Sequence, residues 1–407
     1  MSKRIVLVAA ALLAVAGLAV SAATAASKKP AKTQSSHILV GINDEADTLY
    51  GDPVSAFATL KALKTQVLRV NLYWGGTKWA VANSGRPKDP TDPGDPAYNW
   101  ALYDRLVKYA QTNSIQLVFS ILFTPGWANG GKARTTAPKD FTDLENFAYA
   151  AAERYSGLWI PPSWQLQPQL GVVAGVALPK VNMWTAWNEP NNPIWLTPQY
   201  TKVKGKWQVT SALNYAKICN AIYDGVHSPY LGPLPDEHVA CGVTGPKGND
   251  APGTSRASVD PLTFLAQAHK FGMKTFDVYA HHPYADKGSE APNYVPTGKQ
   301  KRRVQLGNIN LLLSLVSKYY GPKHLWITEY GYQTNPPDKT IFGISWAKQA
   351  SYMSQAFAIA RKNSRIDMFL WFMVRDEPNI SGWQSGLETY AGKKKPSWKT
   401  FVSLPRG

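Results

Sequence analysis

Short apolar, β-branched segments alternate with amphipathic helical patterns along most of the chain. The apolar segments begin near residues 37, 67, 115, 181, 238, 275, 325 and 366. Between and after them, the hydrophobic spacing predicts helices over 53–64, 100–111, 141–155, 212–226, 261–271, 306–320, 346–363 and 397–404. Eight strands alternating with eight helices predict a parallel sheet closed on itself, the single-domain (β/α)8 or TIM barrel of the α/β class. An open doubly wound sheet is the alternative, but the Gly-rich phosphate turn that would indicate it does not occur after an early strand.

Capping residues support these helix boundaries. Asp52 and Asp260 each precede a proline and offer a side-chain acceptor to the first turn of a helix. Gly157 and Gly272 follow the last helical residues of two other patterns, where glycine commonly ends a helix.

Two glutamates lie at the ends of predicted strands. Glu189 belongs to an Asn-Glu-Pro turn after the fourth strand, and Pro190 disfavours an α conformation at this glutamate. Glu329 ends the seventh strand, 140 residues further on (329 − 189). A carboxyl group buried among aromatic side chains favours its protonated form, which suits a proton donor. The three-residue motif is weak evidence alone, but the pair predicts carboxylate chemistry at one rim of the barrel.

Other chemically active side chains fall at the same strand ends, where TIM barrels place their active sites. They are Arg69 in the second strand, Asn188 beside the first glutamate, His281, His282 and Tyr284 after the sixth strand, and Trp371 near the end of the eighth. Long insertions follow strands two, three, four and six, and their aromatic residues Trp79, Trp195 and Trp207 can line a cleft. The histidine pair predicts no metal site, because adjacent strand residues point to opposite faces and no third ligand has useful spacing. We therefore expect neither a metal nor another cofactor.

The chain resembles the clan A retaining glycoside hydrolases, with the barrels of families 5 and 39 as the nearest match. The resemblance extends over the whole mature chain and rests on five features. They are Arg69, the WNEPN motif at 187–191, HHPY at 281–284, TEYG at 328–331 and Trp371. These features together are specific for the clan but weak for the substrate.

The resemblance implies a role for each matched residue. Glu189 would be the general acid/base and Glu329 the nucleophile, while Arg69 and Tyr284 would hold the nucleophile ionised. The remaining roles are binding roles: Asn188 would bind the sugar 2-hydroxyl, His282 would line the same subsite, and Trp371 would form the floor on which the sugar stacks. A structural ion pair inside the barrel is the alternative role for Arg69.

The 407 residues carry a formal net charge of +17, which falls to +15 if Lys3 and Arg4 are removed (17 − 2). The basic residues are spread out and occur in no nucleic-acid-binding motif, so we predict no nucleic-acid partner. The excess charge is instead consistent with a solvated surface or with attraction to an anionic cell-wall polymer. We expect a monomer. The 15 Trp and 20 Tyr residues fit a carbohydrate-binding protein, although most of them will be core residues.

Residues 1–25 have the features of a secretory signal peptide: two basic residues, an apolar run and a small-residue cleavage site. Residues 26–36 form a polar linker, and 37–407 form the barrel domain. An uncleaved membrane anchor is the alternative, but the apolar run is near the lower limit for spanning. We therefore expect a secreted protein with no membrane association after cleavage. In that compartment Cys219 and Cys241 can form a disulfide; otherwise both are small buried apolar residues.

These observations predict a secreted retaining glycoside hydrolase that cleaves O-glycosidic bonds of a poly- or oligosaccharide by double displacement. A transglycosylase would use the same covalent intermediate. A barrel that binds cell-wall carbohydrate without catalysis is the alternative of another class, and loss of either glutamate would indicate it.

Overall fold

The computed structural model describes residues 38–232 and 236–406, so the predicted signal peptide and linker lie outside the described residues. Eight parallel strands close into a barrel in the order β1-β10-β9-β8-β7-β4-β3-β2. Their bounds are β1 Leu39–Asn43, β2 Val67–Tyr73, β3 Gln116–Leu122, β4 Met183–Ala186, β7 His238–Thr244, β8 Val278–His281, β9 His324–Tyr330 and β10 Ile366–Phe372. Each of the eight predicted strands is present, which confirms the TIM barrel.

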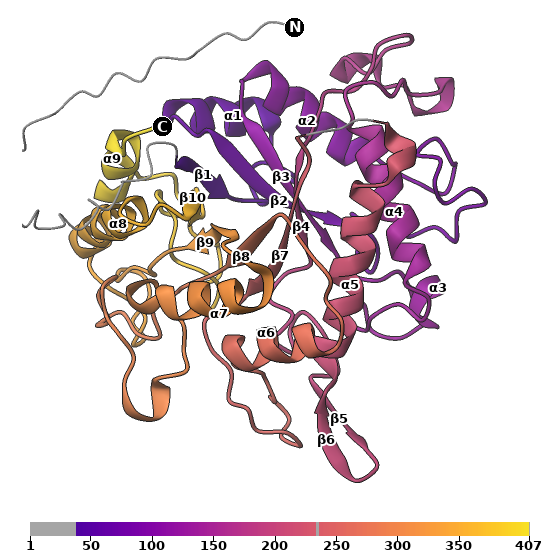
Figure 1. Cartoon of the computed structure of the whole chain (residues 1–407). Coiled ribbons are helices and arrows are strands. Elements are labelled where there is room, and N and C mark those ends of the chain that lie inside the picture. Colours follow the sequence, from indigo (N-terminus) through magenta and orange to yellow (C-terminus); the bar gives the residue numbers. More distant parts are fainter. Residues whose placement is uncertain (1–37, 233–235, 407) are drawn as a thin grey trace, which may run out of the picture. The chain divides into compact units, whose positions relative to one another are not determined.

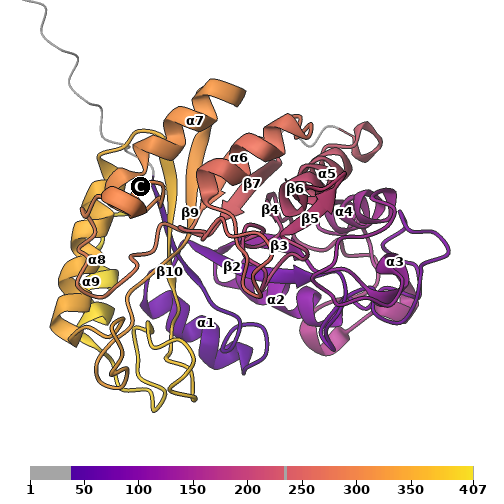
Figure 2. The same cartoon turned by 90° about the horizontal axis from the view of Figure 1, so that it is seen from below.

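Helices surround this barrel, with the strands at the centre in Figure 1 and α1, α6, α7 and α8 on its outside in Figure 2. Their bounds are α1 Pro53–Ala62, α2 Ala101–Thr112, α3 Gly126–Asn129, α4 Thr142–Arg154, α5 Thr210–Val226, α6 Pro261–Lys270, α7 Asn310–Tyr320, α8 Trp346–Arg361 and α9 Pro396–Ser403. The predicted caps are confirmed: Asp52 accepts hydrogen bonds from two backbone N–H groups of α1, and Asp260 does the same for α6. Among the described residues, no helix has the length and apolarity needed to cross a membrane.

Apolar side chains form two layers. A small cluster fills the inside of the barrel and includes Val67, Val118, Met368 and Leu370. A larger cluster packs the outer face of the strands against the helices and includes Phe369 of β10. Because successive strand residues point to opposite faces, this division fixes which side chains can reach the inner rim.

A two-stranded hairpin was not predicted. Strands β5 (Tyr200–Val203) and β6 (Lys206–Val209) pair antiparallel within the insertion that follows β4. The hairpin extends away from the barrel in Figure 1. Its sequence has three lysines and no buried residue, so it lacks the apolar face that identifies a core strand.

The predicted disulfide is confirmed. Cys219 lies in α5 and Cys241 in β7, and their Cα atoms are 5.9 Å apart. This separation falls in the range that a disulfide requires. The bond ties a helix of the outer layer to the strand against which it packs.

Candidate active site

Glu189 and Glu329 face each other across the mouth of the barrel. One carboxylate oxygen of each, together with a ring nitrogen of His282, lies within 4.8 Å of the other two. His282 Nδ1 is 3.0 Å from Glu189 Oε1 and 3.6 Å from Glu329 Oε2. Both carboxylates are partly exposed, so the pair is open to a ligand above it.

The Glu329 carboxylate is held from below by charged and hydroxyl donors. Arg69 Nη1 donates to its Oε1 at 2.6 Å, and the Tyr284 hydroxyl donates to its Oε2 at 3.1 Å. Burial alone raises the pKa of Glu329. Attraction to His282 and Arg69 outweighs burial, so the pKa of Glu329 lies below its usual range and the carboxylate is ionised at neutral pH.

Arg69 also fixes the amide of Asn188. Its Nη2 donates to Asn188 Oδ1 at 2.7 Å, and its Nε donates to the Ser120 hydroxyl at 2.8 Å. Because the amide oxygen is engaged by arginine, the Asn188 Nδ2 group is left as a donor at the pocket wall. The guanidinium thus orients a carboxylate and an amide at the same time.

Glu189 lies three residues beyond the end of β4, in a strained turn. Its φ is 35°, in the left-handed region, and Trp187 is also left-handed with φ of 71°. The proline at 190 disfavours the right-handed conformation, as predicted, and the Glu189 N–H is held by the Val243 carbonyl at 2.8 Å. A Cβ at Gly245 would lie 3.0 Å from the Glu189 carboxyl carbon, so a side chain there would force this carboxylate to shift.

The position of His282 differs from the prediction. Its side chain is fully buried and lies behind the two glutamates, so it does not line the subsite. Its Nε2 is 3.0 Å from the Thr328 hydroxyl. Its Nδ1 also faces the ionised Glu329 carboxylate, which can only accept, so that nitrogen carries a hydrogen. The neighbouring His281 points away from the two glutamates, as predicted. Its pKa is lowered to about 3, mainly by burial, so its ring is neutral.

The Glu189, His282 and Glu329 group is also the group of described residues with the spacing of potential metal ligands. Arg69 already pairs with Glu329 at 2.6 Å. A cation bound here would have to approach this guanidinium, which is itself buried and positively charged. The donor set therefore suits carboxylate chemistry better than metal binding.

A pocket of about 690 Å³ opens over the carboxylates. This volume is in the range that encloses a small organic ligand, about 300–1,000 Å³. Asn188, Glu189, Tyr284 and Glu329 contribute to its wall. Arg69 lies beneath that wall, with its side chain 1% exposed.

Trp371 does not reach the pocket, which corrects the prediction that it forms the sugar-binding floor. Its side chain is fully buried, and its Nε1 donates to the Ser385 carbonyl at 2.9 Å. Met368 and Leu370 point into the barrel, so strand alternation turns Trp371 outward and Phe372 inward. Phe372 and Trp383 line the pocket in its place.

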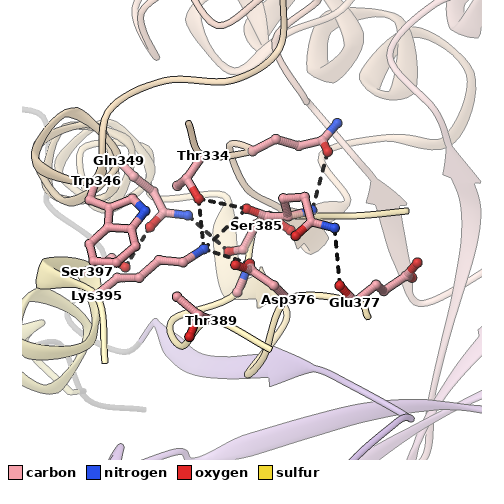
Figure 3. Close-up of polar contacts among 12 residues, drawn as sticks. Thr334, Trp346, Gln349, Asp376, Glu377, Ser385, Thr389, Lys395 and Ser397 are labelled. Carbon is pink, nitrogen blue, oxygen red and sulfur yellow. Dashed lines mark hydrogen bonds and ion pairs between the residues drawn. The ribbon is translucent and has the colours of Figure 1, made fainter. Parts of the chain in front are cut away.

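Trp383 belongs to the loop between β10 and α9, and a buried ion pair anchors this loop (Figure 3). Lys395 Nζ donates to Asp376 Oδ1 at 2.6 Å and to the Thr334 hydroxyl at 2.9 Å, and both charged side chains are inaccessible to solvent. It also donates to the Gln384 carbonyl at 3.3 Å, next to Trp383. Removing one partner of a buried ion pair is strongly destabilising, so this network holds the pocket wall in place.

Sequence reasoning missed part of the site. Glu45, Asn71 and Tyr73 line the pocket at the ends of β1 and β2. The polar residues directly after the first strand were the available signal for Glu45, by the same strand-end rule that identified Glu189 and Glu329. Of the three loop tryptophans, the pocket wall includes Trp195. Trp79 instead stacks on Tyr50, with ring centroids 4.9 Å apart, and Trp207 lies on the hairpin, so neither lines the pocket.

Residues 304–399, which include Glu329, match the family model described as the glycosyl hydrolase catalytic core. The chain matches no curated protein. A family 39 glycoside hydrolase from the gut symbiont Bacteroides cellulosilyticus WH2 is 17% identical with a TM-score of 0.56, over 90% of this chain but only 63% of that one. A glucosidase from Croceicoccus marinus is 13% identical with a TM-score of 0.59, over 91% and 67% of the two chains. A structure from a study of two fungal β-1,4-galactanases is 12% identical with a TM-score of 0.54, over 91% and 100%.

At these identities the structural likeness shows the fold alone. The match of residues 304–399 to a glycosyl hydrolase catalytic core indicates the class of chemistry, which is hydrolysis of glycosidic bonds. The chain is therefore a TIM barrel whose residues 304–399 are similar to the catalytic core of glycosyl hydrolases.

Proposed function

We propose that the protein is a retaining glycosidase that cleaves O-glycosidic bonds of a poly- or oligosaccharide by double displacement. The separation of the two carboxylates is the observation that carries the proposal. Their nearest oxygens lie within 4.8 Å, close to the roughly 5 Å of retaining enzymes and short of the 6.5–9.5 Å of inverting enzymes. An inverting reaction would need space for a water molecule between base and sugar.

The contacts of the two glutamates support different roles. Glu329, kept ionised by Arg69 and Tyr284, attacks the anomeric carbon while Glu189 gives its proton to the departing oxygen. In the second step Glu189, now a carboxylate, takes a proton from water. The water oxygen then attacks the same carbon and releases Glu329. Transfer to a second sugar instead of water would be transglycosylation, and analysis of the products separates the two reactions.

The pocket offers contacts suited to a sugar. The Asn188 Nδ2 group can donate to the 2-hydroxyl of the sugar in the reactive subsite, an interaction that strengthens in the transition state. Trp383, 41% exposed and with its ring 5.5 Å from the Tyr284 ring, offers the aromatic face that the resemblance implies for Trp371. The poly- or oligosaccharide class of the substrate rests on the matched catalytic core.

Net retention of anomeric configuration is the test of this proposal. Proton NMR of an aryl glycoside reaction should show a first-formed hemiacetal with the same anomeric configuration as the substrate. Mutarotation follows more slowly, so early spectra are needed. A hemiacetal of opposite configuration would exclude Glu329 as nucleophile.

We also propose that the protein is secreted, on the evidence of residues 1–25 alone. Expression of the full chain in a bacterial host with a secretion pathway should release a protein that begins at Ala26. N-terminal sequencing of the released and membrane fractions checks this. A membrane-bound form that retains Met1 would contradict it.

A further inference from the structure

One carboxylate of the pocket has no part in the proposed chemistry. Glu45 follows β1 and is partly exposed at the pocket wall. Its Oε1 accepts the backbone N–H of Asn71 at 2.7 Å, and its Oε2 accepts the hydroxyls of Tyr50 and Tyr73 at 3.0 and 2.9 Å. These three donors fix the carboxylate in one orientation.

Glu45 has no ion-pair partner among residues 38–232 and 236–406 within 4.0 Å. An ionised carboxylate has about four acceptor sites, and the three donors leave capacity for a further one. The neighbouring Asn71 side chain also lines the pocket, but its Oδ1 is closed to solvent, so it is not an acceptor for a ligand. Glu45 is therefore the group at the ends of β1 and β2 that can accept a further hydrogen bond.

Acidic residues outnumber lysines in the wall of the pocket. The chain carries a formal charge of +17, but five acidic residues, Asp44, Glu45, Glu189, Glu329 and Glu377, line the pocket against two lysines. Of these five, Glu329 is paired with Arg69, Glu189 holds a proton in the proposed first step, and burial raises the pKa of Asp44 to about 7, so Glu45 and Glu377 remain as the acidic groups without an ion-pair partner among the described residues. Burial raises the pKa of Glu45, and the hydrogen bonds from Asn71, Tyr73 and Tyr50 together with attraction to Arg69 offset this only in part. A sugar carboxylate placed against Glu45 would meet repulsion, whereas a sugar hydroxyl would supply a further donor.

We propose that Glu45 binds hydroxyl groups of the sugar in the reactive subsite and thereby selects a neutral sugar over a uronic acid. This inference rests on the proposed glycosidase function. It names the class of sugar at the cleavage point and a residue that recognises it. The basic outer surface can still attract an anionic polymer, because the acidic pocket governs only the bound ring.

The test measures whether the effect of removing a sugar hydroxyl depends on the presence of the Glu45 carboxylate. 4-Nitrophenyl β-D-glycosides of gluco, galacto, manno and xylo configuration first identify the best hydrolysed sugar. The glycoside of that sugar is the parent glycoside. Values of kcat/KM are then measured for wild type and Glu45→Gln on the parent and on its 3-deoxy and 4-deoxy analogues. The same values are measured on a hexuronide, of gluco or galacto configuration, whichever is closer to the parent. Glu153→Gln, on the outer helix α4, is the matched control.

Loss of the contacted hydroxyl should cost wild type on the order of 100-fold in kcat/KM, as expected for a hydrogen bond to a charged group. In Glu45→Gln the same analogue should lose less than about threefold relative to the parent, because the charged acceptor is already gone. Glu45→Gln should also reduce the ratio of kcat/KM between the parent glycoside and the uronide. Glu153→Gln should reproduce the wild-type pattern. The inference would be overturned if removal of the 3-hydroxyl and removal of the 4-hydroxyl each lowered kcat/KM by the same factor in wild type and in Glu45→Gln.

A second variant covers the case in which Glu45→Gln perturbs folding. Tyr50→Phe keeps the Glu45 carboxylate but removes one of its three donors, so it should weaken discrimination against the same analogue without abolishing it. If none of the glycosides is hydrolysed, binding of these glycosides to Glu329→Gln is measured by calorimetry instead of kcat/KM. Absence of both turnover and binding contradicts the glycosidase proposal and this inference together. Hydrolysis with an unchanged deoxy pattern contradicts only the role of Glu45.

Discussion

Replacing Glu329 with Gln should abolish turnover of every substrate, activated or natural, because in the proposed double displacement this carboxylate forms the covalent bond to the anomeric carbon. The expected loss in kcat is on the order of 10⁴- to 10⁶-fold, as seen when the nucleophile of another hydrolase is removed. Good leaving groups cannot compensate, since no glycosyl-enzyme forms. Initial rates on 2,4-dinitrophenyl and 4-nitrophenyl glycosides measure the effect.

Folding must be checked for this variant, because Arg69 loses its charged partner in a buried position. Thermal unfolding of Glu329→Gln against wild type and Glu153→Gln separates lost chemistry from lost structure. Chemical rescue gives a sharper readout. Azide added to Glu329→Ala should attack the face that the nucleophile normally covers and yield a glycosyl azide of inverted configuration. An azide product of retained configuration would show that the nucleophile lies elsewhere.

Replacing Glu189 with Ala should produce a different profile. With a 2,4-dinitrophenolate leaving group, which needs no protonation, the first step should survive and a covalent adduct on Glu329 should accumulate. With a natural glycosidic bond, loss of general acid catalysis should lower kcat/KM by about 10²- to 10⁴-fold. A burst of dinitrophenolate, with an intact-protein mass increased by one sugar, measures accumulation.

Azide distinguishes this variant from the first. In Glu189→Ala, azide enters the space left by the acid/base and attacks the Glu329-linked sugar, giving a product of retained configuration. Identical activity profiles for the two variants on activated and natural substrates would refute the assignment of roles. The His282 contact is a further point of difference, since its Nδ1 lies 3.0 Å from Glu189 and 3.6 Å from Glu329.

The architecture could be predicted because it follows from local periodicity. Each strand and helix of the barrel has its own apolar pattern, and parallel strands that alternate with helices have few ways to pack. The hairpin β5–β6 has no apolar face and no signal of this kind. It was missed for that reason.

The identities of Glu189 and Glu329 were predicted because the strand-end rule places such side chains at one rim. The same rule applied to the first strand would have found Glu45. The direction of a side chain is harder to predict, because one residue of uncertainty in strand phase turns it to the other face. Trp371 and Phe372 are adjacent, and only packing of β10 against its neighbours shows which one faces inward.

The sequence by itself determined the barrel, the two glutamates and the helix caps, because each depends on local pattern or on residue type at a strand end. The tertiary structure decided the contacts between distant segments. Arg69 contacts Glu329, which is 260 residues away in the sequence, and His282 lies behind the carboxylates. Trp383 lines the pocket from a loop that a buried lysine anchors. No local pattern encodes these contacts, since they arise only when the eight strands close and fix the distance between their ends.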